Sequence, residues 1–151
     1  MELNQQARKA ALERLERFVG DWSIETSFST EVKGSSSFEW TLDGQFLVQR
    51  SSVPVPEAPD SVSIVGVDQS GEVYTQHYFD SRGVARLYAM TLDGDAWQLL
   101  RNEPDFFPLD FSQRYVGRFT ADGDTIEGRW ETSRDGGDWE LDFGLSYRRV
   151  R

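Results

Sequence analysis

From Asp21 onward, apolar and polar residues alternate with a period of two, and short segments rich in Asp and Gly interrupt the alternation at regular intervals. Successive side chains of a β-strand point to opposite faces of a sheet, so this pattern predicts half-buried strands joined by tight turns. We expect ten strands, at about residues 21–29, 35–42, 45–53, 61–68, 72–80, 83–91, 95–101, 111–121, 124–133 and 138–149.

The connections between these strands are mostly short. Two-residue hairpin turns are favoured by four dipeptides, Asp43-Gly44, Asp93-Gly94, Asp122-Gly123 and Gly136-Gly137. The longer connections lie at residues 54–60 and 102–110. No helical segment separates the strands, so the hairpins form an antiparallel meander, which removes its free edges by closing. The predicted fold class is all-β, a roughly ten-stranded up-and-down barrel over residues of about 21–150.

One helix is expected ahead of the barrel, at about residues 4–18. Its apolar residues recur at helical spacing, with charged residues on the opposite side: Ala11, Leu12, Leu15, Phe18 and Val19. Asn4 is suited to cap the first turn, and Gly20 is suited to end the helix. We expect the helix to lie against the barrel or to close one end of it.

Composition limits the classes of function. The 151 residues are enough for one domain with a core of its own, and we expect a single domain over residues 1–151. The chain has no cysteine, which excludes disulfides and thiolate sites and fits a reducing, cytoplasmic location. No signal peptide or membrane span is recognisable. A net charge of −10 disfavours nucleic acid and anionic membranes as partners.

The hairpin at Asp122-Gly123 predicts which face of the barrel wall is buried. A two-residue turn there places Phe119 opposite Ile126 and Tyr115 opposite Trp130 on one face. The other face then carries opposite charges, with Arg114 facing Glu131 and Arg118 facing Glu127. The aromatic face is expected to point inward. The next hairpin, at Gly136-Gly137, is expected to pair Trp130 with Phe143, Thr132 with Leu141 and Glu131 with Asp142.

Three features together resemble a calycin-type barrel. The first is Gly20-Asp21-Trp22 after the helix, similar to the Gly-x-Trp motif whose Trp plugs one end of lipocalin-like barrels. The second is an arginine-bearing last strand, Tyr147-Arg148-Arg149-Val150. The third is an ordered set: residues 77–84, residues 92–97 and the span from Phe119 to Trp130. The set resembles a large family of uncharacterised bacterial lipocalin-like proteins over residues of about 15–150.

Two better-known relatives of that family fit less well. Fatty-acid-binding proteins insert a helix pair after the first strand, but only residues 30–34 are available for that connection here. Nitrobindin-like barrels ligate haem through a histidine near the last strand, where this chain reads Phe143-Gly144-Leu145-Ser146-Tyr147. The single histidine, His77, lies on the fifth strand instead. We expect no haem, no other cofactor and no metal.

The candidate binding residues lie on the strands at residues 72–101 and 111–133. If Ser81-Arg82 and Asp93-Gly94 are the turn centres, His77, Arg86 and Arg101 form a cross-strand row beside Tyr88. We assign this face inward because it carries Trp97, Leu99, Met90, Val84 and Phe79, whereas the opposite face carries Tyr74, Gln76, Tyr78, Leu87 and Leu100. Three buried cations require an anion, which arginine binds through its forked donors.

The sequence therefore predicts a binding protein for a small, largely apolar molecule, with an acidic group recognised by the basic row. The site residues are expected to be His77, Arg86, Arg101, Tyr88, Tyr115, Trp97 and Trp130. Each also has a structural interpretation: the aromatic residues pack the interior, and the two arginines pair with Glu103 or Asp105. The sequence leaves two alternatives open: a barrel enzyme with His77 as acid or base, and a homodimeric interaction module without a ligand. It also leaves open whether the interior of the barrel is empty or filled by side chains.

Overall fold

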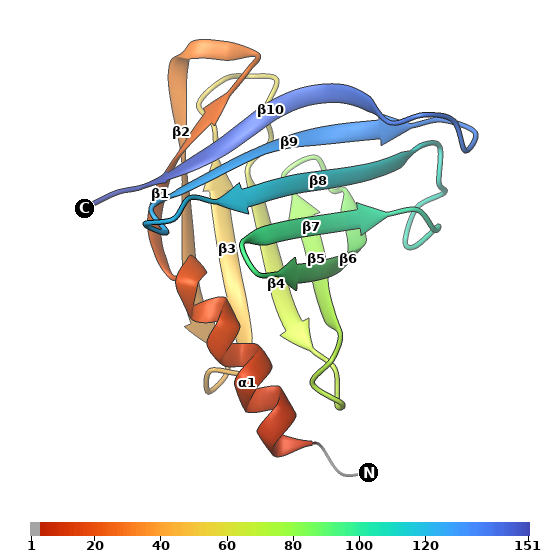
Figure 1. The fold of residues 1–151 in the computed structure, drawn as a ribbon. Coiled ribbons are helices and arrows are strands. Elements are labelled where there is room, and N and C mark those ends of the chain that lie inside the picture. The colour runs from red at the N-terminus through yellow and green to blue at the C-terminus, as the bar shows by residue number, and fades with distance from the viewer. Residues whose placement is uncertain (1–3) are drawn as a thin grey trace.

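The protein is a closed antiparallel barrel of ten strands preceded by one α-helix, seen here in a computed structural model (Figure 1). The structure describes residues 4–151, except for the side chain of Thr30. Residues 1–3 of the predicted domain lie outside the described residues. The predicted fold class is confirmed. Within residues 4–151, no helix has both the length and the apolar character needed to cross a membrane.

The helical segment consists of α1 (Gln5–Leu15) and a 3-10 turn, η1 (Glu16–Phe18). The strands follow as β1 (Gly20–Thr26), β2 (Ser29–Thr41), β3 (Phe46–Ser52), β4 (Ser61–Val67), β5 (Tyr74–Asp80), β6 (Ala85–Asp93), β7 (Ala96–Arg101), β8 (Ser112–Phe119), β9 (Thr125–Ser133) and β10 (Glu140–Arg149). Each strand pairs with its neighbours in sequence, and β1 pairs with β10 to close the barrel. The first hairpin is tighter than predicted, because residues 29–34 belong to β2 and the connection is Ser27-Phe28.

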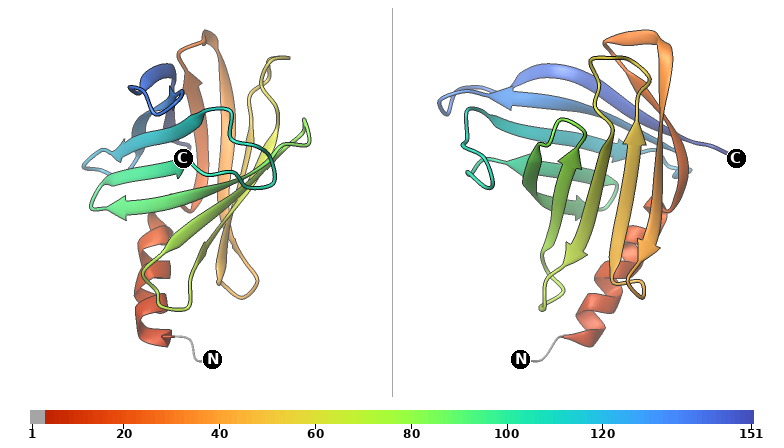
Figure 2. Two further views of the ribbon diagram at one scale, coloured as in Figure 1. Left: turned by 90° about the vertical axis from the view of Figure 1, so that its right-hand side faces the viewer. Right: turned by 180° about the vertical axis from the view of Figure 1, so that it is seen from behind.

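The helix lies across the end of the barrel at which β1 begins (Figures 1 and 2). Asn4 caps it, since its side-chain oxygen accepts a hydrogen bond from the Ala7 N–H at 3.1 Å. Arg8 is buried and donates to the Val67 and Asp68 carbonyls, while the Tyr74 hydroxyl donates to the Ala11 carbonyl at 2.7 Å. These bonds attach the polar groups of the helix to the rim of the barrel.

Aromatic residues fill the barrel beside the helix. The Phe18 ring packs against Phe38, Trp97 and Phe119 at centroid distances of 5.3, 4.9 and 5.1 Å. Trp22 is 1% exposed and lies beneath the Arg149 guanidinium, whose carbon is 4.2 Å from the ring centroid. These contacts close one end of the barrel, so a cavity can open only toward the other end.

The predicted register is confirmed in one hairpin and changed in another. In β8–β9, Phe119 pairs with Ile126 and Tyr115 with Trp130, as the two-residue turn requires. In β9–β10, Trp130 pairs with Phe143 as predicted, but a bulge between Leu141 and Phe143 shifts the end of the strand. The predicted pairs Thr132–Leu141 and Glu131–Asp142 are therefore wrong. The bulge also moves Asp142 away from a like charge.

The register predicted for β5–β6 is wrong by one residue. The loop contains Ser81, Arg82 and Gly83, and Gly83 has a positive φ of 85°. The Asp80 N–H donates to the Val84 carbonyl at 3.0 Å. The turn between these two residues therefore has three residues, whereas the sequence predicts two. A shift of one residue turns every β5 side chain to the opposite face relative to β6.

The β6–β7 register differs from the predicted register by two residues, so the same side chains of both strands still point into the barrel. Gly94 and Asp95 form the turn in place of Asp93-Gly94, and Asp93 pairs with Ala96. Gly94 has a φ of 58°, the conformation that favours glycine at the first central position of such a turn. The predicted inward orientation of β6 and β7 therefore holds.

Candidate functional site

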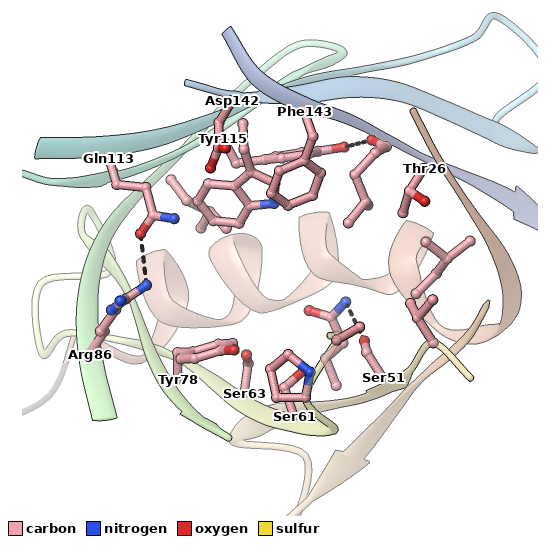
Figure 3. A pocket seen from close by; sticks show the side chains of 18 of the residues that line it. Thr26, Ser51, Ser61, Ser63, Tyr78, Arg86, Gln113, Tyr115, Asp142 and Phe143 are labelled. Carbon is pink, nitrogen blue, oxygen red and sulfur yellow. Dashed lines mark hydrogen bonds between the residues drawn. The ribbon is translucent and has the colours of Figure 1, made fainter. Parts of the chain in front are cut away.

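The barrel contains a cavity of about 790 Å³ that opens at the end opposite α1 (Figure 3). Its mouth is lined by residues of the loops that connect strands at that end, including Phe28, Pro59, Arg82 and Phe111. The interior is thus open, which answers the question that the sequence left undecided. The volume lies in the usual range for a site that encloses a small organic molecule.

A pair of glycines helps to keep the cavity open. Gly117 and Gly128 face each other on β8 and β9, and the Tyr115 ring covers both. A Cβ atom on Gly128 would lie 2.0 Å from the Tyr115 Oη, so any side chain there would displace the ring. In this position the Tyr115 hydroxyl donates to the Leu145 carbonyl at 2.9 Å. The ring therefore lies along the barrel wall.

One wall of the cavity is aromatic and aliphatic. The ring centroids of Trp97 and Tyr115 are 5.0 Å apart, those of Tyr115 and Trp130 are 5.3 Å apart, and those of Trp130 and Tyr88 are 5.7 Å apart. All four line the cavity, as predicted from the sequence. Aliphatic and aromatic residues of β7 and β10 extend this wall: Leu99, Phe143 and Leu145.

The opposite wall is polar but uncharged. It is formed by β3, β4 and β5, through Gln49, Ser51, Ser61, Ser63 and Gln76. Figure 3 shows Ser51, Ser61 and Ser63 across the cavity from Tyr115 and Phe143. Gln76 is predicted on the outer face, but the three-residue turn before β6 places it inside. A cavity with one apolar and one hydrogen-bonding wall was not foreseen.

Arg86 places a cation on the cavity wall without a carboxylate partner, whereas Arg82 at the mouth pairs with Asp80. The Arg86 Nη1 donates to the Gln113 Oε1 at 3.1 Å (Figure 3). The Tyr88 hydroxyl donates to the same oxygen at 2.8 Å. No carboxylate of residues 4–151 lies within 4 Å of the Arg86 guanidinium, although Glu57 and Asp142 also line the cavity. Arg86 is thus a half-buried cation whose side-chain partner is a neutral amide.

Arg101, by contrast, is committed to a structural ion pair. It donates to both carboxylate oxygens of Asp105 at 2.8 Å, and the two side chains are 5% and 3% exposed. The same guanidinium donates to the Phe107 and Pro108 carbonyls, while Asp105 accepts a bond from the Leu87 N–H. This pairing is the structural interpretation that the sequence offers for Arg101. The hydrogen bonds from Arg101 lower the pKa of Asp105 far below its usual range.

His77 does not face the cavity, so this part of the predicted basic row is wrong. It is exposed on the outer face of β5, where it pairs with Ile64 on one side and Leu87 on the other. The physical reason is the additional turn residue between β5 and β6. The side chains that enter the cavity from β5 are Gln76 and Tyr78.

The phenols of the cavity are hydrogen-bonding groups. Burial raises the pKa of Tyr88 and of Tyr115, and it raises the pKa of Tyr147 to about 12. Burial, followed by the hydrogen bond to Asp80, also raises the pKa of Tyr78. At neutral pH these hydroxyls therefore stay protonated. Among residues 4–151, no group of three or more His, Asp or Glu side chains is arranged to hold a metal ion.

Comparison with known proteins shows that this chain is similar to a solved structure in its fold. The sequence matches no protein-family model, and no curated protein matches it. Among solved structures, the chain is similar to the crystal structure of Rv2717c from M. tuberculosis, with a TM-score of 0.60 and 13% sequence identity. The match covers 93% of this chain and 98% of that chain. At this identity the likeness shows a common barrel architecture, which is compatible with small-molecule binding.

Proposed function

We propose that this protein is a lipocalin-like binding protein for a small, largely apolar molecule that carries an acidic group. One observation carries the proposal: a cavity of about 790 Å³ has an arginine, Arg86, on its wall with no carboxylate of residues 4–151 beside it. The aromatic wall accepts the apolar part of the ligand. The acidic group binds the guanidinium.

The surroundings of Arg86 favour an anion over a neutral group. A half-buried cation loses part of its hydration, and a neutral amide such as that of Gln113 compensates only a fraction of this cost. A carboxylate or sulfonate restores it through charge-assisted hydrogen bonds, which are roughly twice as strong as neutral ones. The other arginine at the mouth, Arg82, already pairs with Asp80 at 2.7 Å. Arg86 is therefore the anion-binding residue.

The test uses two fluorescent probes that differ in one sulfonate group. Anilinonaphthalene sulfonate is acidic, and N-phenylnaphthylamine is its neutral counterpart. Replacing Arg86 with Met keeps an unbranched side chain as far as the δ position and removes the guanidinium charge. We expect R86M to lower the affinity for the sulfonate by about 10-fold or more, the effect of a hydrogen bond to a charged group. The affinity for the neutral probe should change by less than about 3-fold, since it makes no such bond.

Two control variants separate this effect from a general change in charge. Arg118 is exposed on the outer face of β8, so R118M removes the same charge without touching the cavity. His77 is exposed outside β5, so H77A should leave the binding of both probes unchanged. Titrations at physiological salt limit long-range effects of the net charge of −10. Equal losses of both probes in R86M, or equal losses of the sulfonate in R86M and R118M, would contradict the proposal.

A further inference from the structure

The uncharged polar wall of the cavity allows the ligand to be described more closely. We propose, building on the function proposed above, that the ligand is a rigid, flat ring system with hydroxyl or carbonyl groups along one side. Its chemical class is a hydroxylated polycyclic aromatic acid. A flexible fatty acyl chain is the alternative occupant of an apolar barrel, and the two walls distinguish them.

The aromatic wall favours flat rings. Tyr88, Trp130, Tyr115 and Trp97 follow one another with centroid distances of 5.7, 5.3 and 5.0 Å, so their rings form a continuous packed layer, of which Trp130 is the partly exposed member. Trp97 and Tyr115 are 2% and 1% exposed and are held by packing on β7 and β8. Offset or edge-to-face contacts between rings add to the burial of apolar area. An acyl chain would gain only the free energy of burying its apolar surface.

The polar wall opposite has hydrogen-bonding capacity that the protein leaves unused. The hydroxyls of Ser61 and Ser63 make no hydrogen bond to any residue of the described range 4–151. The Gln76 Oε1 is buried and also lacks a partner among those residues, and the Gln76 side chain as a whole is 3% exposed. Buried polar groups without partners are destabilising and are rare unless water or a ligand satisfies them.

This unused capacity argues against an acyl chain. A chain that filled the cavity would displace water from Ser61 and Ser63 and offer no hydrogen bond in return. Displacement of bound water by a group that cannot replace its bonds lowers affinity. A ligand carbonyl can accept from Ser63, and a ligand hydroxyl can donate to the Gln76 Oε1 once that buried side chain turns toward the cavity. The wall therefore selects a ligand with polar groups on the side away from the aromatic rings.

The register places the acid site and the polar wall within the reach of one molecule. Ser63 pairs with Tyr78, and Tyr78 pairs with Arg86, so these inward-facing residues form one row across three neighbouring strands. Two strand spacings separate Ser63 from Arg86, a distance of about 10 Å between their backbones. A system of three fused rings spans such a distance, with its acid at Arg86 and its polar side toward β4 and β5.

The test compares three acids by isothermal titration calorimetry. Rhein is a dihydroxyanthraquinone carboxylate, anthraquinone carboxylate is the same ring system without the hydroxyls, and palmitate is the flexible chain. We expect rhein to bind about 10-fold more tightly than anthraquinone carboxylate, the effect of one hydrogen bond of about 1.4 kcal/mol. We expect palmitate to be the weakest of the three.

Two variants of the polar wall identify the groups involved. Q76L should reduce the preference for rhein by about 10-fold, since it removes the acceptor and keeps the size of the side chain. S63A is a milder change that should reduce the same preference, and it keeps the test usable if Q76L does not fold. Gln98 and Ser35 lie on the outer side of β7 and β2, so Q98L and S35A are the matched controls.

Three outcomes overturn the inference: palmitate binds as tightly as rhein, rhein binds no better than anthraquinone carboxylate, or both wall variants keep the full preference for rhein. The probe experiment with R86M distinguishes the two proposals. If R86M still removes the preference for the sulfonate, only the inference about the shape of the ligand fails. If wild-type protein binds none of the acids, the proposed function fails as well.

Discussion

Substitution of Gly128 by alanine tests how the cavity is kept open. The added Cβ would lie 2.0 Å from the Tyr115 Oη and 2.4 Å from its Cζ, whereas ordinary contact begins at 3.4 Å. The phenol must therefore move by about 1.4 Å, because the backbone of β9 lies behind the new methyl group. It can move only toward the cavity, which breaks its 2.9 Å hydrogen bond to the Leu145 carbonyl.

The expected cost follows from these two changes. Loss of a buried hydrogen bond and overpacking each destabilise by about 1–3 kcal/mol, so we expect a loss of about 2–6 kcal/mol in the free energy of unfolding. For a chain of this length, at about 2–4 °C per kcal/mol, the melting temperature should fall by about 4–24 °C. Urea unfolding followed by tryptophan fluorescence measures the first quantity, and calorimetry measures the second. The displaced ring should also weaken the binding of both naphthalene probes.

A control and a double-mutant cycle isolate the contact with Tyr115. In G144A the new Cβ meets Ser27 atoms at 3.5 and 3.6 Å, an ordinary contact, so its effect should stay within about 0.5 kcal/mol. Tyr115→Leu removes the ring atoms that clash, so G128A should be nearly neutral in that background. The reasoning is refuted if G128A costs no more than G144A, or if its cost is the same with leucine at position 115.

Three further predictions concern buried ionisable groups. Arg101→Met leaves the Asp105 carboxylate buried without its partner and should lower the free energy of unfolding by about 3–5 kcal/mol at neutral pH. Because the hydrogen bonds from Arg101 lower the pKa of Asp105 in the folded state, the stabilisation is present above the unfolded pKa of about 3.9 and is lost as the pH falls. The stability difference between wild type and D105N should therefore shrink on acidification, and a constant difference down to low pH would contradict the assignment. Tyr147 gives a pH dependence of the opposite direction, because burial raises its pKa to about 12 in the folded state. The protonated phenol contributes its full stabilisation below the unfolded pKa of about 10. This contribution is lost as the pH rises through the folded pKa. Ultraviolet titration should show fewer late-ionising phenols in Y147F than in wild type; identical titrations would refute the assignment.

The β8–β9 hairpin shows how far local sequence information reaches. An Asp-Gly turn of defined length, period-two alternation and opposite charges on the outer face all specify the same register. The observed pairs Tyr115–Trp130 and Arg114–Glu131 agree with that prediction. Where several local signals agree, the inner face of a strand is therefore predictable. Trp97, Tyr88 and Arg86 on the neighbouring strands also line the cavity as expected.

The β5–β6 hairpin shows where local information is insufficient. The segment Asp80-Ser81-Arg82-Gly83 is compatible with a turn of two or of three residues, and the two options place opposite faces of β5 inside. The longer turn is stabilised by the Asp80 carboxylate, which accepts bonds from the Arg82 and Val84 N–H groups. A change of one residue there exchanged His77 for Gln76 and Tyr78 in the cavity. The histidine had been the most conspicuous candidate.

The sequence by itself determined the all-β class, the ten strands and the helix at the barrel end, because period and turn chemistry are properties of neighbouring residues. Only the tertiary structure decided the character of the site. Arg101 is paired by a loop that folds back over β6, while Arg86 remains beside a neutral amide. The interior is open because Tyr115 lies over two glycines of adjacent strands. Each of these outcomes depends on contacts between segments that meet only when the barrel closes.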